Sequence, residues 1–225
     1  MPAKNATRAG GLLIAAEGLD GSGKSAGLDS LSRWLEGKGR RVHVVPWVSS
    51  RLVARASRAP GGRQALTPRV AALLGAAEAA RRFDREIREP LAKGHVVLAD
   101  RYAWTAVVRE VARGLEPDWV SAVYRIAPTP DLVIFHRQDP RAALARALAS
   151  RPSPVGAEAV SAAYGTFLGR MVAAFDHLVA DPGSGPWPVR TLVLDPRGPL
   201  DARVAAVRDA VRPMLDSPVS GGPWK

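Results

Sequence analysis

Residues 18–25 read Gly-Leu-Asp-Gly-Ser-Gly-Lys-Ser, and this segment constrains the fold of the chain more than any other. It matches the pattern G-x-x-x-x-G-K-[ST] of a phosphate-binding loop, or P-loop. An apolar run, residues 11–16, precedes the loop, and leucines follow it at helical spacing, at positions 28, 31 and 35. A strand, this loop and a helix in that order predict the first unit of a parallel α/β sheet.

The residue types in the loop fit a bound nucleotide. Glycines permit backbone conformations that a side chain forbids, so successive N–H groups can turn toward phosphate oxygens at a helix N-terminus. We expect Lys24 to reach the β- and γ-phosphates and the hydroxyl of Ser25 to bind Mg²⁺, which keeps most of its waters. The residues expected to bind ATP in this loop are Gly18, Gly21, Ser22, Gly23, Lys24 and Ser25.

The composition is that of a single domain with its own core. The chain has 225 residues, 47% of them hydrophobic, and we expect one domain over residues 1–215 and a flexible tail over 216–225. There is no cysteine, which excludes disulfides and zinc–thiolate sites and agrees with a reducing, cytoplasmic location. The polar N-terminus and the absence of a long apolar stretch predict no signal peptide and no membrane contact.

The formal net charge of +11 raises nucleic acid as a candidate partner. The arginines are scattered along predicted helices rather than gathered in one block, and a polyphosphate substrate also needs several of them. We therefore favour a small nucleotide or nucleoside over nucleic acid as the partner, and keep a homodimer as a candidate assembly.

Strand-like and helix-like segments alternate, which predicts an α/β three-layer sandwich: a five-stranded parallel sheet with helices on both faces. The expected strands are residues 11–16, 41–47, 95–99, 131–136 and 189–195. The expected helices are residues 24–37, 69–91, 104–113, 117–126, 140–149, 157–180 and 200–215, and residues 48–67 are expected to be a loop with one short helix. A Pro- and Ser-rich break near residue 152 predicts a short lid over about residues 146–158.

Asp100, Arg101 and Tyr102 follow directly on the predicted strand 95–99. Ligands of open α/β sheets bind beyond the carboxyl ends of the strands, so these residues are expected to face the same crevice as the P-loop. Asp100 could hold Mg²⁺ or orient the acceptor, and Arg101 could offset phosphate charge. Asp20, inside the loop, is expected to contact an acceptor hydroxyl, with a simple turn residue as the alternative.

Further arginines lie where they could reach phosphates. Arg141 is expected on a solvated helix face, whereas Arg146 and Arg151 beside the predicted lid could close over the transferred group. The predicted helix 69–91 carries a charged stripe and an apolar side opposite to it. The stripe consists of Glu78, Arg81, Arg82 and Arg85, and the apolar side of Val70, Leu73, Leu74 and Ala77. The four histidines have no metal-like spacing and are read as structural.

The chain resembles the thymidylate kinase family. The segments that carry the resemblance are 17–25, 87–91, Asp100-Arg101-Tyr102, 130–134 and 140–146. The resemblance implies a five-stranded nucleoside monophosphate kinase fold that moves the γ-phosphoryl group of ATP to dTMP with Mg²⁺. It implies that Lys24 and Ser25 serve ATP and Mg²⁺, that Asp20 and Arg101 face the acceptor, and that Arg146 contacts ATP from the lid.

Several positions depart from the family pattern on the acceptor side. Arg51 is the candidate replacement for an arginine that the family has after the second strand. Glu78-Ala79 stands where the family has Asp-Arg, with Arg81 or Arg82 as candidate substitutes.

After Asp-Arg-Tyr, Thr105 stands at a serine position of the family, and Arg109-Glu110 replaces a Tyr-Gln pair that helps hold thymine. The lid also lacks the family's acidic element after Arg151. A pocket that reads one base by hydrogen bonds rejects others, so these changes predict a changed acceptor.

The sequence thus predicts an ATP- and Mg²⁺-dependent phosphotransferase with dTMP as the default acceptor. The alternatives are a kinase of a nucleoside, of a modified pyrimidine or of a base within DNA, where Trp47 and Trp104 could stack, and a non-catalytic ATP-binding module. The expected catalytic residues are Lys24, Asp100, Arg101, Arg146 and Arg151. The expected substrate-binding residues are Asp20, Arg51, Arg81, Arg82, Arg101, Tyr102, Thr105 and Arg109.

Overall fold

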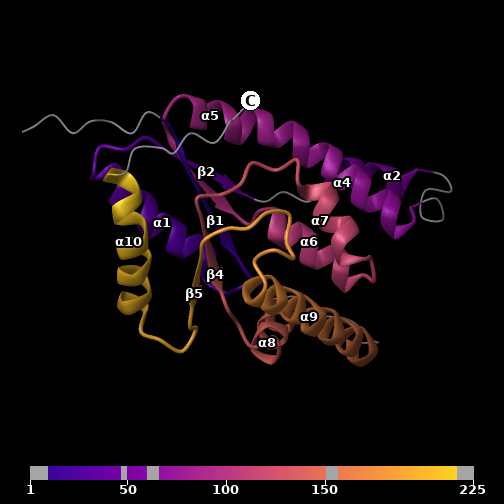
Figure 1. Ribbon diagram of the computed structural model, residues 1–225. Helices are drawn as coiled ribbons and strands as arrows, with labels where there is room; N and C mark the ends of the chain where they lie inside the picture. Colours follow the sequence, from indigo (N-terminus) through magenta and orange to yellow (C-terminus); the bar gives the residue numbers. More distant parts are fainter. Residues whose placement is uncertain (1–9, 47–49, 60–65, 151–156, 217–225) are drawn as a thin grey trace, which may run out of the picture.

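The computed structural model describes residues 10–46, 50–59, 66–150 and 157–216, and the side chains of these residues except 146–150 and 157–161. Five parallel strands form one sheet in the order β2-β3-β1-β4-β5 (Figure 1). The strands are β1 (Leu12–Glu17), β2 (Val42–Pro46), β3 (Val96–Asp100), β4 (Leu132–His136) and β5 (Thr191–Leu194). All five lie where the sequence predicted them, within a few residues at each end, and the predicted α/β class is confirmed.

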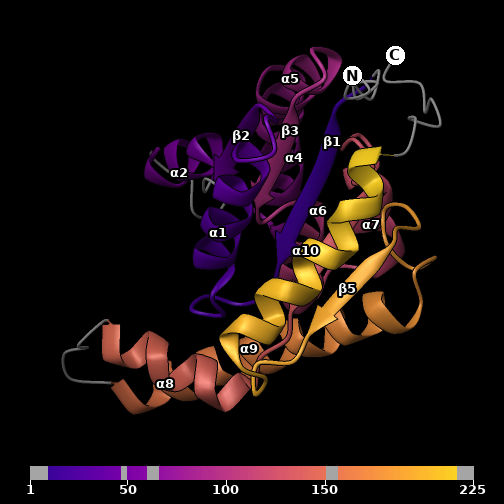
Figure 2. The ribbon, with the colours of Figure 1, turned by 90° about the vertical axis from the view of Figure 1, so that its left-hand side faces the viewer.

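The three central strands are apolar up to their last residue because helices cover both sheet faces. On one face, α1 (Lys24–Glu36) and α10 (Leu200–Asp216) pack through Leu28, Leu31 and Val211. On the other face lie α4 (Pro68–Arg82), α6 (Ala103–Ala112), α7 (Pro117–Tyr124) and α9 (Ala157–Ala180). The remaining α-helices are α2 (Arg51–Arg58), α5 (Glu89–Ala92) and α8 (Pro140–Ser150). In Figure 2, α8 lies beside α9, beyond the carboxyl end of the sheet.

The predicted helix 69–91 is not one regular helix. Between α4 and α5 the chain makes a wider π-helical segment, η1 (Phe83–Arg88). Phe83, Ile87 and Leu91 are all buried, and they recur every four residues. A regular helix turns every 3.6 residues and would rotate this series off the core, whereas the wider turn keeps it on one face.

The apolar side that the sequence predicted for this helix is wrong. Val70 and Leu73 are 41% and 51% exposed, and the buried residues of α4 are Ala72, Ala76 and Ala79. Small residues face the core here because α4 packs close to neighbouring helices, so residue size and not hydrophobicity marks the buried face.

The register of the sheet brings the functional segments together. Ala16 of β1 pairs with Asp100 of β3, and Glu17 pairs with Phe135 of β4, so these strands end at one level. The loop after β1 and the segment after β3 therefore open on the same edge. Within the described part of the chain, no helix has the length and hydropathy needed to cross a membrane.

Candidate active site

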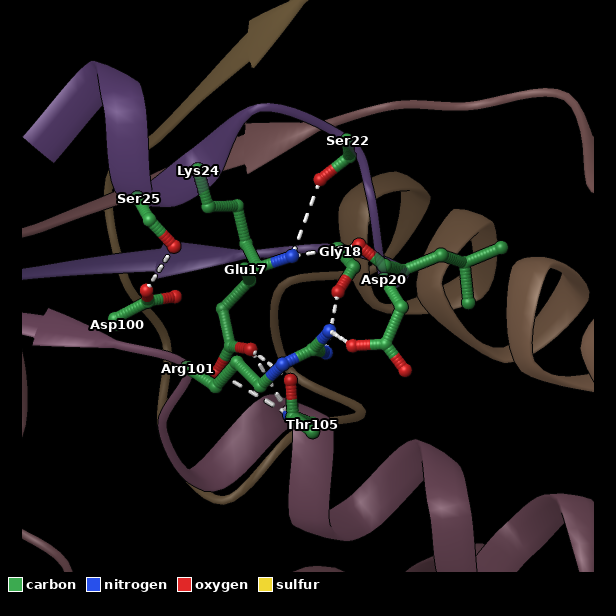
Figure 3. A network of polar contacts seen from close by, with 10 residues as sticks. Glu17, Gly18, Asp20, Ser22, Lys24, Ser25, Asp100, Arg101 and Thr105 are labelled. Carbon is green, nitrogen blue, oxygen red and sulfur yellow. Dashed lines mark hydrogen bonds and ion pairs between the residues drawn. The ribbon is translucent and has the colours of Figure 1, made fainter. Parts of the chain in front are cut away.

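The P-loop connects β1 to α1 and curls around the start of the helix (Figure 3). Gly18, Gly21 and Gly23 all have positive φ, at 137°, 72° and 86°. A Cβ atom on Gly18 would lie 2.5 Å from the carbonyl oxygen of His136, so this position requires glycine for space as well as for conformation. The loop thus has the backbone that the motif predicted, with the N-terminus of α1 at its end.

Lys24 points back into the loop and is buried. Its Nζ donates to the carbonyl oxygen of Leu19 at 2.6 Å and to Oγ of Ser22 at 3.2 Å. Burial, together with the charge of Arg101, lowers the pKa of Lys24 from 10.5 to about 8. The ammonium is therefore mainly protonated at neutral pH and is held where a phosphate would complete its hydrogen bonds.

Ser25 and Asp100 meet across the gap between α1 and β3, where Oγ of Ser25 donates to Oδ2 of Asp100 at 2.5 Å. Both face a cavity of about 380 Å³, here called the transfer cavity. It is lined by Asp20, Gly21, Gly23, Lys24, Ser25, Ala26, Pro46, Asp100 and Arg101. A hydroxyl and a carboxylate at hydrogen-bond distance are hard oxygen ligands, and Mg²⁺ needs only one or two of these when phosphates supply the rest. The residues present therefore fit this ion.

Arg101 is a non-glycine residue with positive φ, at 69°. Its backbone N–H donates to Ala16 at 2.9 Å, and its guanidinium donates to the carbonyl of Gly18 at 2.7 Å and pairs with Asp20. These contacts hold a cation beside the P-loop in the wall of the transfer cavity (Figure 3). Left-handed backbone at a non-glycine residue is a strained conformation that is concentrated at functional sites.

Glu17 is a residue whose importance the sequence reasoning missed. It is 1% exposed and lies beneath the P-loop, where it accepts from the backbone N–H groups of Tyr102 and Thr105 and from the hydroxyl of Thr105. Burial raises its pKa from 4.5 to about 7. Glu17 thus fixes the start of α6 against the end of β1. An acidic residue at the end of an otherwise apolar strand was the signal that could have found it.

A second cavity, here called the acceptor cavity, lies between α2, α4 and α6 and has a volume of about 260 Å³. Its wall on this side is one stripe of α6, Ala106, Arg109 and Glu110, continued by Arg113 at the C-cap of the helix, at spacings of three and four residues. The remaining lining residues are Ser50, Val53, Ala54, Ala71, Gly75, Glu78, Ala79, Arg82 and Tyr124.

Two charged residues of the acceptor cavity, Glu78 and Arg82, make hydrogen bonds to neighbouring segments. Glu78 accepts from the backbone N–H of Leu52 at the start of α2. Arg82 pairs with Glu86 and donates to the carbonyl of Pro46 at 2.9 Å, and Pro46 also lines the transfer cavity. Arg82 therefore links the walls of the two cavities.

The expected substrate-binding residues fall into three groups: some line a cavity, some are exposed and some are buried beneath the site. Arg82 and Arg109 line the acceptor cavity, whereas Arg51 and Arg81 are exposed and line neither cavity. The remaining two, Tyr102 and Thr105, are 2% and 0% exposed, and the hydroxyl of Tyr102 donates to Pro128 at 2.8 Å. These two side chains act beneath the site as supports.

Three further expectations concern the lid and the tryptophans. The side chain of Arg146 and all of Arg151 lie outside the described residues, as does Trp47, so the lid stays a prediction. Trp104 is 1% exposed, and the expectation that it could stack on a base is wrong.

A parallel sheet in the order 2-3-1-4-5, with a P-loop after its central strand and a Ser–Asp contact to the neighbouring strand, defines an α/β P-loop kinase fold. The sequence model described as thymidylate kinase matches residues 16–164, which is more than half of the chain. The chain therefore belongs to the thymidylate kinase family.

Individual relatives agree with this assignment. The chain is 38% identical over 136 residues to a probable thymidylate kinase 2 of Saccharolobus solfataricus, covering 60% of this chain and 63% of that protein. It is 35% identical over 145 residues to a thymidylate kinase of Nitratidesulfovibrio vulgaris, covering 61% and 65% of the two chains. The chain thus spans less than two thirds of the length of these relatives.

Proposed function

We propose that this chain transfers the γ-phosphoryl group of ATP to the phosphate of a nucleoside monophosphate, with Mg²⁺ as the metal and dTMP as the default acceptor. The observation that carries the proposal is the adjacency of the two cavities. The P-loop and the pair Ser25–Asp100 line the transfer cavity. Arg82 of the acceptor cavity, which has a size for a small molecule, donates a hydrogen bond to Pro46 in the wall of the transfer cavity.

The residues of the chain act by positioning and by offsetting charge. An oxygen of the acceptor phosphate attacks the γ-phosphorus while the bond to the β-phosphate oxygen breaks, and ADP leaves with that electron pair. Lys24 and the loop N–H groups hold the β- and γ-phosphates, and Arg101 stabilises charge on the group in transit. Mg²⁺ would be held by Ser25 and Asp100 and would neutralise phosphate charge.

The first test is Lys24→Ala. We expect phosphoryl transfer to fall by at least about 100-fold, because an ammonium aimed at the transferred phosphate is lost. The measurement is chromatographic detection of ADP and of the diphosphate product, with ATP, Mg²⁺ and dTMP. Lys38→Ala is the matched control because Lys38 is an exposed lysine just after α1.

Unchanged turnover in a folded Lys24→Ala protein would contradict the proposal. ATP binding without turnover on any monophosphate would instead support the alternative of a non-catalytic ATP-binding module. One argument for phosphorylation of a base within DNA no longer holds, because Trp104 is buried and cannot stack on a base. The homodimer and the cytoplasmic location stay predictions.

A further inference from the structure

The acceptor cavity contains a buried carboxylate oxygen that has no hydrogen-bond partner. Glu110 is 8% exposed, and its Oε1 pairs with Arg113 at the C-cap of α6. Its Oε2 is buried and makes no hydrogen bond. Buried polar atoms without partners are rare in folded proteins, and each needs a reason.

Packing alone does not provide that reason. Leaving a buried acceptor unsatisfied costs about 1–3 kcal/mol, and more for a charged group. The stripe of α6 that carries Glu110 faces a cavity and not the core, so an apolar residue would fit here without this cost. Burial raises the pKa of Glu110, and Arg113 and Arg109, two cations on the same wall, oppose that rise and favour the charged form.

The chemistry of this wall selects the kind of base that can bind. A carboxylate only accepts hydrogen bonds, and guanidinium groups only donate them. An amino-substituted pyrimidine of the cytosine type presents an amino donor next to acceptors, and glutamate accepting from that amino group is an established pairing. Thymine presents a carbonyl oxygen at the same position, which a carboxylate repels.

We propose that Glu110 reads the acceptor base, and that its free Oε2 gives the acceptor cavity a preference for a pyrimidine nucleoside monophosphate with an exocyclic amino group over dTMP. This inference rests on the proposed function, which assigns the acceptor to this cavity. A volume of about 260 Å³ lies at the small end for ligand cavities, which favours a single-ring base. Arg109 and Arg113 supply donors for the ring nitrogen and the 2-carbonyl.

The test compares two substrates that differ along one edge of the base. 5-Methyl-dCMP and dTMP have the same sugar, phosphate and 5-methyl group. They differ in the 4-amino or 4-oxo group and at the adjacent N3, which accepts a hydrogen bond in 5-methyl-dCMP and donates one in dTMP. We expect kcat/KM to be at least tenfold higher for 5-methyl-dCMP in the unaltered protein. Glu110→Gln adds an amide donor that can bond to a 4-oxo group, so we expect it to lower that ratio by at least tenfold.

Glu89→Gln is the matched control, because Glu89 also pairs with the basic residue at the C-cap of its helix, Lys93, but lies outside the cavity. It should leave the ratio unchanged. Calorimetric binding of the two monophosphates provides a readout that does not depend on turnover.

The two proposals fail differently. Tighter binding and faster turnover of dTMP, with the same ratio in Glu110→Gln, would overturn the role of Glu110 and leave the kinase proposal intact. Selective binding of 5-methyl-dCMP without turnover would contradict the kinase proposal and would support recognition of the base by Glu110. If the variant does not fold, the ratio measured for the unaltered protein still decides the preference.

Discussion

At the scale of single residues, the site contains two groups whose native conformation or burial costs free energy, Arg101 and Glu17. Arg101 has a backbone conformation that costs about 1–2 kcal/mol for a residue with a Cβ atom. Its hydrogen bonds to Ala16 and Gly18 offset that cost and fix the direction of its guanidinium. Glu17 is likewise held by the backbone of α6 beneath the loop. Neither property follows from residue type, because both arise from atoms far away in the sequence.

Two substitutions at Arg101 separate backbone strain from charge. Arg101→Gly should be more stable than Arg101→Ala by about 1 kcal/mol, because glycine adopts positive φ without a Cβ clash. Both variants lack the guanidinium and should lose phosphoryl transfer to a similar extent. Urea denaturation measures the first difference and initial rates the second. Equal stability of the two variants would show that φ at this position carries no strain.

Glu17 makes folding depend on pH in a defined direction. Its pKa is raised from 4.5 to about 7, so between these values the folded state holds a proton that the unfolded state has lost. The free energy of unfolding should therefore fall as the pH rises from about 4.5 to 7. Burial lowers the pKa of His136 from 6.5 to about 4, which gives the opposite slope over most of this range.

The difference between the unaltered protein and Glu17→Gln isolates the first effect. We expect the free energy of unfolding of the unaltered protein, relative to that of Glu17→Gln, to fall by up to about 3 kcal/mol between pH 4.5 and 7. Chemical denaturation at a series of pH values measures it, with the exposed Glu116→Gln as control. A difference that stays constant with pH, or grows, would rule out the raised pKa.

At the scale of elements, the alternation of apolar runs and helical spacing predicts nearly every strand and helix. The errors occur where packing changes the geometry of an element. The predicted helix 69–91 contains η1, and its buried face consists of alanines in α4 and of Phe83, Ile87 and Leu91 further on, rather than Val70 and Leu73. A prediction from periodicity assumes that the helix is regular and that large apolar residues face the core. A closely packed helix with a π-helical segment meets neither assumption.

Phe83 and Ile87 are the buried residues of this irregular segment, and Phe83 is the larger of the two. It is 4% exposed and packs edge-to-face on Tyr102, with ring centroids 5.3 Å apart. Phe83→Ala should lower the free energy of unfolding by about 3–5 kcal/mol because it leaves a cavity between η1 and α6. Asp84→Ala removes only the exposed pair with Arg88 and should cost less than about 1 kcal/mol. Thermal and urea denaturation compare the two, and similar losses would contradict the role assigned to Phe83.

At the scale of the whole molecule, the strand order decides what the motifs can do together. β1 lies between β3 and β4, so the P-loop opens beside Asp100 and Arg101 although some 75 residues separate Ser25 from Asp100. The acceptor cavity forms where α2, α4 and α6 meet on the same side as this edge. Five cations line the two cavities, Lys24 and Arg101 in one and Arg82, Arg109 and Arg113 in the other, although the sequence has no single basic segment.

The sequence by itself determined the fold class, the strands, the P-loop and the family, because these depend on local patterns: eight residues of a motif and the spacing of apolar side chains. The tertiary structure decided which charged residues face a cavity. Arg82, Arg109 and Glu110 line one, whereas Arg51 and Arg81 do not, and Tyr102 lies in the core. That division depends on how helices rotate when they pack against each other, and local sequence does not fix that rotation.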